Sequence, residues 1–186
     1  MAPDRTKPET AFIIVMGVSG SGKSTIASLL AIRLGWTYED GDWFHPANNV
    51  AKMHAGHALE DEDRWPWLRA IAAAMADARR QNKRMVIACS ALKRKYRDIL
   101  VNGARDVHIV YLKGTREQIA LRMSLRHGHF MPPSLLDSQF DTLEEPQADE
   151  RPIVVSTDAH PKELVERIVA QLRDTKSLPP ESGAIL

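Results

Sequence analysis

The chain has 186 residues, and its 25 Lys and Arg residues nearly balance its 24 Asp and Glu residues, giving a formal charge of +1. This balance argues against a general nucleic-acid binder, which needs a strongly basic surface. No apolar run approaches the ~20 residues of a membrane-spanning helix, and the polar segment 1–10 lacks the apolar core of a secretory signal. The single cysteine excludes an internal disulfide. We therefore expect one cytoplasmic domain with no membrane or nucleic-acid partner.

Short apolar runs alternate along the chain with segments of helical periodicity. Continuous apolar runs are typical of buried parallel strands, and the periodic segments between them predict helices. The alternation predicts an α/β fold, a five-stranded parallel sheet flanked by helices, which binds ligands beyond the carboxyl ends of its strands. The predicted strands are 12–16, 36–39, 85–89, 107–112 and 153–156, and the predicted helices are 24–34, a segment around 68–75, 93–100, 116–126 and 161–173.

A phosphate-binding loop follows the first predicted strand. Residues 17–24, GVSGSGKS, match the pattern G-x-x-x-x-G-K-[ST] at every position. The glycines let backbone N–H groups turn toward phosphate oxygens, and the next helix adds the positive end of its dipole. Lys23 is expected to reach the β- and γ-phosphates of ATP, and the Ser24 hydroxyl to bind Mg²⁺. The alternative is a glycine-rich turn without a ligand. The predicted nucleotide-binding residues are Gly17, Val18, Ser19, Gly20, Ser21, Gly22, Lys23, Ser24 and Thr25.

The sequence also indicates which class of phosphate-loop protein this is. A GTPase needs the guanine-reading pattern N-K-x-D, whereas the nearest string, NKRM at 82–85, lacks the aspartate. Motor and transport ATPases carry an acid at the end of an apolar strand to hold Mg²⁺, but the third strand here ends in ACS. Small-molecule kinases take that acid from the end of the second strand, where Asp40-Gly41-Asp42 lies. The pattern favours a small-molecule kinase.

The two aspartates of this turn are expected to have different roles. If the turn lies beside the phosphate loop, Asp42 can accept the proton of an attacking hydroxyl, and Asp40 can hold Mg²⁺ through water. The alternative is a turn in which both carboxylates only bond to nearby backbone.

Longer segments resemble the gluconokinase family. These are DGDWFHPANNVAKMHAGHALEDEDRWPWL, CSALKRKYRDIL and LRHGHF, and the resemblance extends over residues 12–172. It implies ATP-dependent phosphorylation of D-gluconate at its 6-hydroxyl, a fold like that of nucleoside monophosphate kinases, and a homodimer. Two rivals remain open: a sister kinase acting on shikimate, adenylyl sulfate or a nucleotide, and a nucleotide-binding regulator without acceptor chemistry.

Gluconate is a small polyol with one carboxylate, so its pocket needs a cation and several hydrogen-bonding groups. Arg64 can grip a carboxylate with two parallel bonds, although a surface ion pair is its alternative. His45 also fits a turn cap, and Lys93 also fits a solvated helix. The predicted acceptor residues are Asp42, His45, Lys52, Arg64, Ser90 and Lys93.

A mobile lid is predicted at residues 122–134. Arg122 and Arg126 lie four residues apart, on one helical face, and are expected to stabilise the charge on the transferred phosphoryl group. The following loop, GHFMPP, would close over the site. The alternative is a solvated basic helix face. We expect a flexible N-terminus at 1–11, the kinase domain at 12–174 and a mobile tail at 175–186, which has no periodicity.

Overall fold

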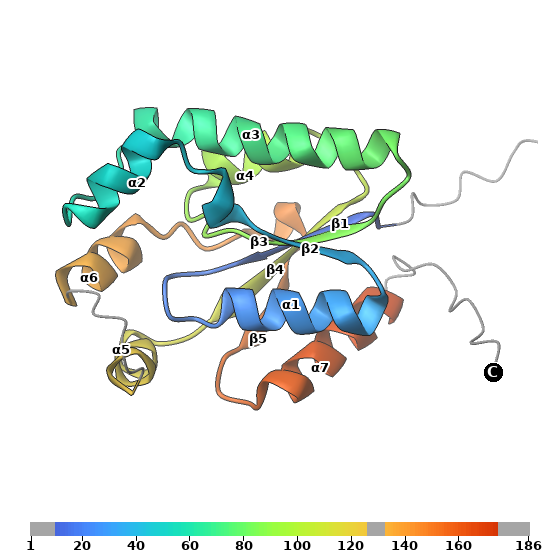
Figure 1. Ribbon diagram of the computed structural model, residues 1–186. Helices are drawn as coiled ribbons and strands as arrows, with labels where there is room; N and C mark the ends of the chain where they lie inside the picture. Colours follow the sequence, from blue (N-terminus) through green and yellow to red (C-terminus); the bar gives the residue numbers. More distant parts are fainter. Residues whose placement is uncertain (1–9, 126–132, 175–186) are drawn as a thin grey trace, which may run out of the picture.

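Strands and helices alternate along residues 10–125 and 133–174, the part of the chain that the computed structural model describes (Figure 1). The strands form one parallel sheet in the order second, third, first, fourth, fifth, which confirms the predicted α/β architecture. In chain order the elements are β1 Phe12–Met16, α1 Lys23–Leu34, β2 Thr37–Asp40, the 3₁₀ turn η1 Gly41–Phe44, α2 Ala47–His54, α3 Asp61–Arg80, β3 Met85–Ala88, α4 Arg94–Val101, β4 Val107–Lys113, α5 Arg116–Ser124, α6 Pro133–Thr142, η2 Ala148–Glu150, β5 Ile153–Ser156 and α7 Pro161–Asp174.

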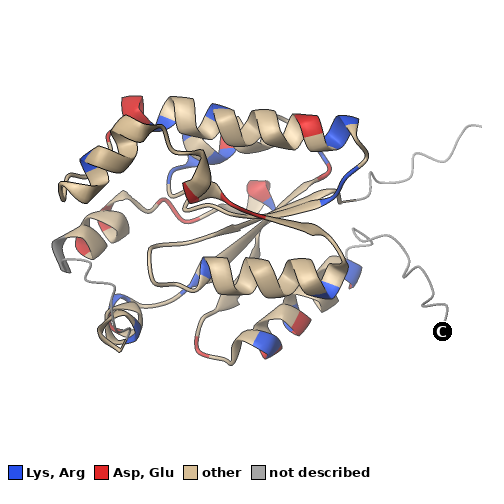
Figure 2. Cartoon of the chain, viewed as in Figure 1, with Lys and Arg blue, Asp and Glu red and all other residues tan. Residues whose placement is uncertain are grey.

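Two apolar layers, one on each face of the sheet, hold the helices in place. Helices α1 and α7 cover one face through residues such as Leu30 and Ile168, and α3 and α4 cover the other through Ile71 and Tyr96 (Figure 1). All five residues of β1 are buried, as expected for a central strand with helices on both sides. Along the outer surfaces of α3 and α7, basic and acidic residues are mixed (Figure 2).

The structure corrects several predicted boundaries. Strand β2 begins at Thr37, one residue late, because the Trp36 N–H still donates to Ala31 O at 2.9 Å beyond the left-handed Gly35 that ends α1. Helix α5 ends at Ser124 rather than at Arg126. Helices α2 and α6 were not predicted from the sequence, and α6 begins inside the range expected to be the lid.

The structure describes the end of the predicted N-terminal segment, residues 10 and 11, but not the predicted C-terminal tail. Thr10 is fully buried and the Ala11 N–H donates to Asp106 O at 2.9 Å, so these residues belong to the sheet layer rather than to a free N-terminus. The predicted C-terminal tail, 175–186, lies outside the described residues, as does most of the predicted lid. Within the described ranges, no helix combines the length and apolar character needed to cross a membrane.

The carboxyl ends of β1, β2 and β3 meet at one edge of the sheet. Ala88 is in register with both Val15 and Asp40, so the segments that follow these strands emerge together. Gly41 lies so close to this edge that an added Cβ atom would be 2.6 Å from Ala88 O. Cys89, directly after β3, is buried here as well, with 1% of its surface exposed. The close approach at Gly41 brings the turn after β2 against the end of β3.

Candidate active site

The phosphate loop joins β1 to α1 with its glycines in left-handed conformations. Gly20 has φ 79° and Gly22 has φ 96°, and Gly22 precedes α1 without a side-chain cap. The first N–H groups of α1 therefore have no capping side chain and point toward the loop opening, where a helix N-terminus attracts anions. Gly17 leaves no room for a side chain, because an added Cβ would lie 2.8 Å from Ser21 Oγ. These glycine conformations agree with the loop expected at residues 17–25, and the binding of a triphosphate there stays a prediction.

The first two side chains of α1, Lys23 and Ser24, form hydrogen bonds within the predicted site. Lys23 Nζ donates to Val18 O at 2.9 Å, across the loop. Ser24 Oγ donates to Asp40 Oδ2 at 3.0 Å, so the turn after β2 lies beside the phosphate loop, as the mechanism requires.

The Asp40 carboxylate is fixed by three donors. Besides Ser24, the Tyr38 hydroxyl donates to Oδ2 at 2.9 Å and the Asp42 N–H donates to Oδ1 at 3.0 Å. Burial, and then the bond to Asp40, raise the pKa of Tyr38 to about 12, so this hydroxyl keeps its proton. Asp40 thus accepts a hydrogen bond from nearby backbone, as in a simple turn, and its Oδ2 also lies beside the Ser24 hydroxyl.

The oxygens of Ser24 and Asp40 suit Mg²⁺, which takes oxygen ligands and is usually held by one or two carboxylates together with substrate phosphates. Among residues 10–125 and 133–174 there is no cluster of three or more His, Cys, Asp or Glu side chains able to bind a metal ion without a substrate. The donor set therefore fits a magnesium ion that arrives with a nucleotide.

Asp42 stands more openly than Asp40. Its side chain is 84% exposed, and Oδ1 lies 3.9 Å from His45 Nε2. Reduced hydration of the carboxyl group, followed by repulsion from Asp40, raises its pKa, while the Lys23 charge opposes the rise. Because so much of the side chain still meets water, we regard the rise as modest. A carboxylate with a raised pKa is a better proton acceptor near neutral pH.

His45 lies in the wall of the site rather than on its surface. Its ring stacks on Trp67 at 4.3 Å between centroids, and Asn49 Nδ2 approaches Nδ1 at 3.4 Å, which assigns the ring proton to Nε2, on the Asp42 side. Burial, with a smaller effect of Arg64, lowers the pKa of His45 to about 4. It is therefore a neutral hydrogen-bonding group at pH 7. Its backbone N–H also ends η1 by donating to Asp42 O, as a turn cap would.

Lys52 and Arg64 both have hydrogen-bond partners around the first turn of α3. Lys52 Nζ donates to Asp63 Oδ2 at 2.6 Å, which joins α2 to the first turn of α3. Arg64 donates from Nε and Nη2 to Leu59 O at 3.3 and 3.2 Å, and its guanidinium lies 5.5 Å from the centre of the Tyr96 ring. These partners are a carbonyl and a ring, not the neighbouring acids of the ion-pair alternative, and Nη1 lies outside the bond to Leu59.

The segment after β3 completes this edge. Gly17 N–H donates to Ser90 O at 3.4 Å, so Ser90 borders the phosphate loop. Lys93 Nζ donates to Asp61 Oδ1 at 3.0 Å, and Lys95 and the Tyr96 hydroxyl donate to the same carboxylate. These donors hold the pKa of Asp61 well below its usual range. Asp61, in the first turn of α3, thereby joins α3 to α4.

The structure describes only part of the segment that was predicted to be the lid. Arg122 is half-buried on α5, whereas Arg126 and the tip of the lid lie outside the described residues. Helix α5 itself rests on the phosphate loop, because a Cβ added to Gly20 would be 2.7 Å from Met123 Cγ. The pairing of the two arginines therefore stays a prediction.

Three residues of this region were not singled out from the sequence. Tyr38 lies two residues before Asp40, on the same side of β2, and this period-two spacing was an available signal. Asn49 is buried and donates to Asp63 O at 2.7 Å, and Gln139 accepts from the Ser19 N–H at 2.6 Å. The sequence around those two amides gives no local sign of these contacts.

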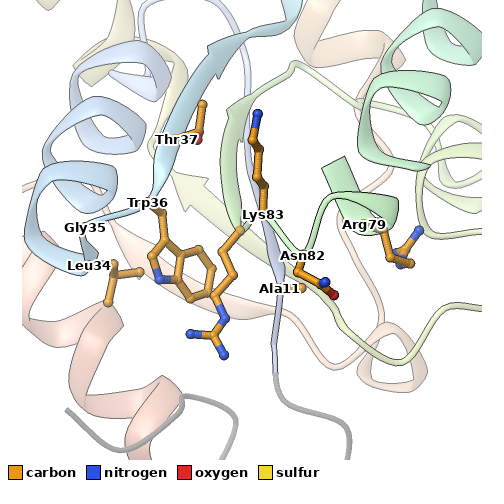
Figure 3. A pocket seen from close by; sticks show the side chains of 9 residues that line it. Ala11, Leu34, Gly35, Trp36, Thr37, Arg79, Asn82 and Lys83 are labelled. Atoms are coloured by element: carbon orange, nitrogen blue, oxygen red, sulfur yellow. The ribbon is translucent and has the colours of Figure 1, made fainter. Parts of the chain in front are cut away.

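An open hollow of about 720 Å³ lies at the opposite edge of the sheet (Figure 3). Its walls come from the last turns of α1 and α3 and from the segments that lead into β1, β2 and β3, at the end of the strands away from the phosphate loop. Its size alone does not make it the active site, because ligands of parallel sheets bind beyond the carboxyl ends of the strands. Its lining residues are Ala11, Leu34, Gly35, Trp36, Thr37, Arg79, Asn82, Lys83 and Arg84.

A phosphate loop and two strand-end aspartates on a parallel 2-3-1-4-5 sheet define a phosphate-loop kinase of small molecules. In agreement, residues 19–173 match the shikimate kinase family. The fold also resembles that of shikimate kinase from Bacteroides thetaiotaomicron, with a TM-score of 0.62 at 16% identity over 88% of this chain and 98% of that one.

Other relatives are much nearer in sequence. The chain is 51% identical over 141 residues to the thermosensitive gluconokinase of Escherichia coli strain K12, which covers 76% of this chain and 75% of the relative. A gluconokinase crystal structure from Sinorhizobium meliloti 1021 matches with a TM-score of 0.81 at 42% identity, over 92% of this chain and 95% of that one. The chain belongs to the gluconokinase family, as the resemblance in its sequence implied.

Proposed function

We propose that this protein is an ATP-dependent gluconokinase that transfers the γ-phosphate of ATP to the 6-hydroxyl of D-gluconate, giving 6-phosphogluconate and ADP. The observation that carries the proposal is the 3.0 Å bond between Ser24 and Asp40, since it holds the Asp-Gly-Asp turn beside the phosphate loop. A nucleotide regulator has no use for a carboxylate at that place. Membership of the gluconokinase family supports the choice of acceptor.

Phosphoryl transfer needs positioning and charge stabilisation more than covalent chemistry. The loop N–H groups and Lys23 hold the triphosphate, with the Lys23 ammonium at the β- and γ-phosphates. The gluconate 6-oxygen attacks the γ-phosphorus as the bond to the β–γ bridging oxygen breaks, and Asp42 takes the proton of the hydroxyl. The raised pKa of Asp42 suits this step. Arg122 and Arg126 would stabilise the charge on the transferred group from the lid.

Ser24 would bind Mg²⁺ directly and Asp40 through water, and the bound ion supplies neutralisation of the phosphate charge. Apart from binding the metal, Ser24 and Asp40 also have a structural role, because the hydrogen bond between them fixes the distance between α1 and the turn after β2. The Tyr38 hydroxyl holds the other side of the Asp40 oxygen, so the carboxylate cannot swing away from the loop.

The acceptor residues divide into direct contacts and supports. We assign the gluconate carboxylate to Arg64, whose guanidinium is presented by Leu59 O and Tyr96, and hydroxyl contacts to neutral His45 and Ser90. Lys52 and Lys93 add positive charge to the same edge while they hold Asp63 and Asp61. Trp67 and Tyr96 are covered by His45 and Arg64, which disfavours the aromatic slot that a nucleotide acceptor needs.

One measurement tests the proposal against its rivals. ADP release from ATP is followed with gluconate, shikimate, adenylyl sulfate and nucleoside monophosphates in turn. We expect gluconate alone to raise the rate far above basal hydrolysis. Acceleration by another acceptor instead would identify a sister kinase, and no acceleration by any acceptor would leave only the regulator.

The homodimer that the family resemblance implies is also a proposal. Light scattering coupled to size exclusion should give twice the chain mass of 20.8 kDa. A mass of one chain at micromolar concentration would contradict it.

A further inference from the structure

One peptide unit of the phosphate loop, between Val18 and Ser19, is held from both sides. Its carbonyl oxygen accepts from Lys23 Nζ at 2.9 Å and from the Ser21 N–H at 3.2 Å. Its N–H donates to Gln139 Oε1 at 2.6 Å, from a helix 120 residues further along the chain. The cation expected at the β- and γ-phosphates and the Gln139 amide therefore meet at the same peptide.

Helix α6, which carries Gln139, has its own attachments to this part of the molecule. Leu136 is buried in a small apolar cluster with Val18, Leu92 and Ile119, and Phe140 packs against that cluster. Further ties link α6 to its surroundings: Arg116 of α5 forms ion pairs with Asp137 and Asp141, and the Glu144 carboxylate after α6 accepts from the Arg94 N–H. Packing thus delivers the Gln139 amide to the loop without help from a nucleotide.

A peptide unit is planar and its N–H and C=O groups point in opposite directions. A bond that fixes the direction of the Ser19 N–H therefore fixes the direction of the Val18 carbonyl, which holds the Lys23 ammonium. We propose that Gln139 is a positioning residue: it orients the 18–19 peptide and through it Lys23, so that helix α6 sets the rate of phosphoryl transfer. This inference rests on the proposed kinase function and extends it to a residue outside the phosphate-loop motif.

The variant Gln139→Met tests the bond, because methionine keeps the length and apolar stem of glutamine but lacks its strong acceptor oxygen. We expect kcat for gluconate phosphorylation to fall about 10- to 100-fold, the range that small misplacements in an active site produce. The KM for gluconate should stay within about twofold, because the acceptor residues come from other elements. The melting temperature should fall by no more than the ~2–4 °C of one lost hydrogen bond.

Gln139→Glu separates the acceptor oxygen from the rest of the amide. Its carboxylate still accepts from the Ser19 N–H, so kcat at saturating ATP should stay within about threefold of the wild type, while the added negative charge raises the KM for ATP. The control Gln171→Met makes the same change on the exposed side of α7 and should behave as the wild type.

A Gln139→Met enzyme with wild-type kcat would overturn the inference, and so would equal losses of kcat in the Met and Glu variants. If the Met variant melts far below the wild type, the Glu variant decides: a folded Glu variant with low kcat overturns the inference, and one with high kcat supports it. Failure of the proposed function looks different, because then the wild type itself shows no gluconate-dependent ADP release.

Discussion

The phosphate loop and the acceptor edge lie at the same end of the sheet, but they are built in different ways. The loop is made of consecutive backbone groups between a fully buried strand and the helix that follows it. The acceptor edge is made of side chains from η1, α2, α3 and the segment between β3 and α4, and these parts are joined by bonds such as Trp67 Nε1 to Gly41 O at 2.6 Å. Nucleotide binding therefore depends mainly on local conformation, with Gln139 of α6 as a contact from outside the loop, and acceptor recognition depends on the packing of separate elements. Changes in the first should act mainly on kcat, and changes in the second on the KM for gluconate.

The largest effect is expected at Asp42, where the two regions meet. Asp42→Asn removes the proton acceptor and should lower kcat by about 10²–10⁴-fold, the usual contribution of a general base, while thermal unfolding stays near that of the wild type. In the wild type, the acid limb of kcat/KM should lie above the ordinary aspartate pKa of about 4, because the pKa of Asp42 is raised. A near-normal rate for Asp42→Asn would remove the base assignment.

Lys23→Ala tests the loop alone. Loss of the ammonium from the β- and γ-phosphates should lower kcat by about 10²–10³-fold, as removal of one charge-stabilising group does elsewhere. Steady-state kinetics at saturating gluconate would measure it. If the main change were instead in the KM for gluconate, the two regions would not be separable in the way proposed.

Arg64→Ala tests the acceptor edge. A hydrogen bond between charged groups contributes about 1.5–3 kcal/mol, so the KM for gluconate should rise roughly 10- to 100-fold with little change in kcat. The control Arg69→Ala removes an exposed arginine from the same helix and should leave both constants unchanged. An unchanged KM for Arg64→Ala would mean that another cation binds the carboxylate.

The smallest effect concerns stability at low pH and the buried His45. Its pKa of about 4 in the folded protein lies below the ordinary value near 6.5, so between these values the unfolded chain binds a proton that the folded chain does not. Stability is therefore lost as the pH falls, by about 2 kcal/mol between pH 7.5 and 5 from this residue. Urea unfolding at both pH values measures this change in the free energy of unfolding, which should be about 2 kcal/mol smaller in His45→Gln than in the wild type. In the control His160→Gln, which changes an exposed histidine, the free energy of unfolding should depend on pH as in the wild type.

The sequence predicted best what is determined locally. All five strands were found, and those at 12–16 and 153–156 match β1 and β5 at both ends, because buried apolar runs mark parallel strands clearly. Helix α2 was not predicted, because its eight residues are held by tertiary hydrogen bonds, from Asn49 to Asp63 O and from Lys52 to the Asp63 carboxylate. Its own sequence has no helical stripe long enough to detect.

The same division holds within the site. The position of the loop followed from its motif, and the closeness of the Asp-Gly-Asp turn to the loop was a condition of the prediction, which the bond from Ser24 to Asp40 meets. The roles of Asp61 as a partner of Lys93, and of Gln139 as a partner of Ser19, depend on elements 32 and 120 residues apart. Sequence spacing alone does not encode such contacts, since the crossing of whole helices decides them.

The burial of Cys89 has a practical consequence. It is the sole cysteine of the chain, it is 1% exposed, and burial raises the pKa of its thiol to about 12. Alkylating reagents attack the thiolate, so this group should stay inert to maleimide dyes in the folded enzyme. A cysteine introduced at Leu125, which is 71% exposed at the end of α5, or at Ile32, 75% exposed on α1, would then be the single labelling position. A fluorophore at Leu125, at the end of the helix that rests on the phosphate loop, would report on movement around the nucleotide without any background substitution.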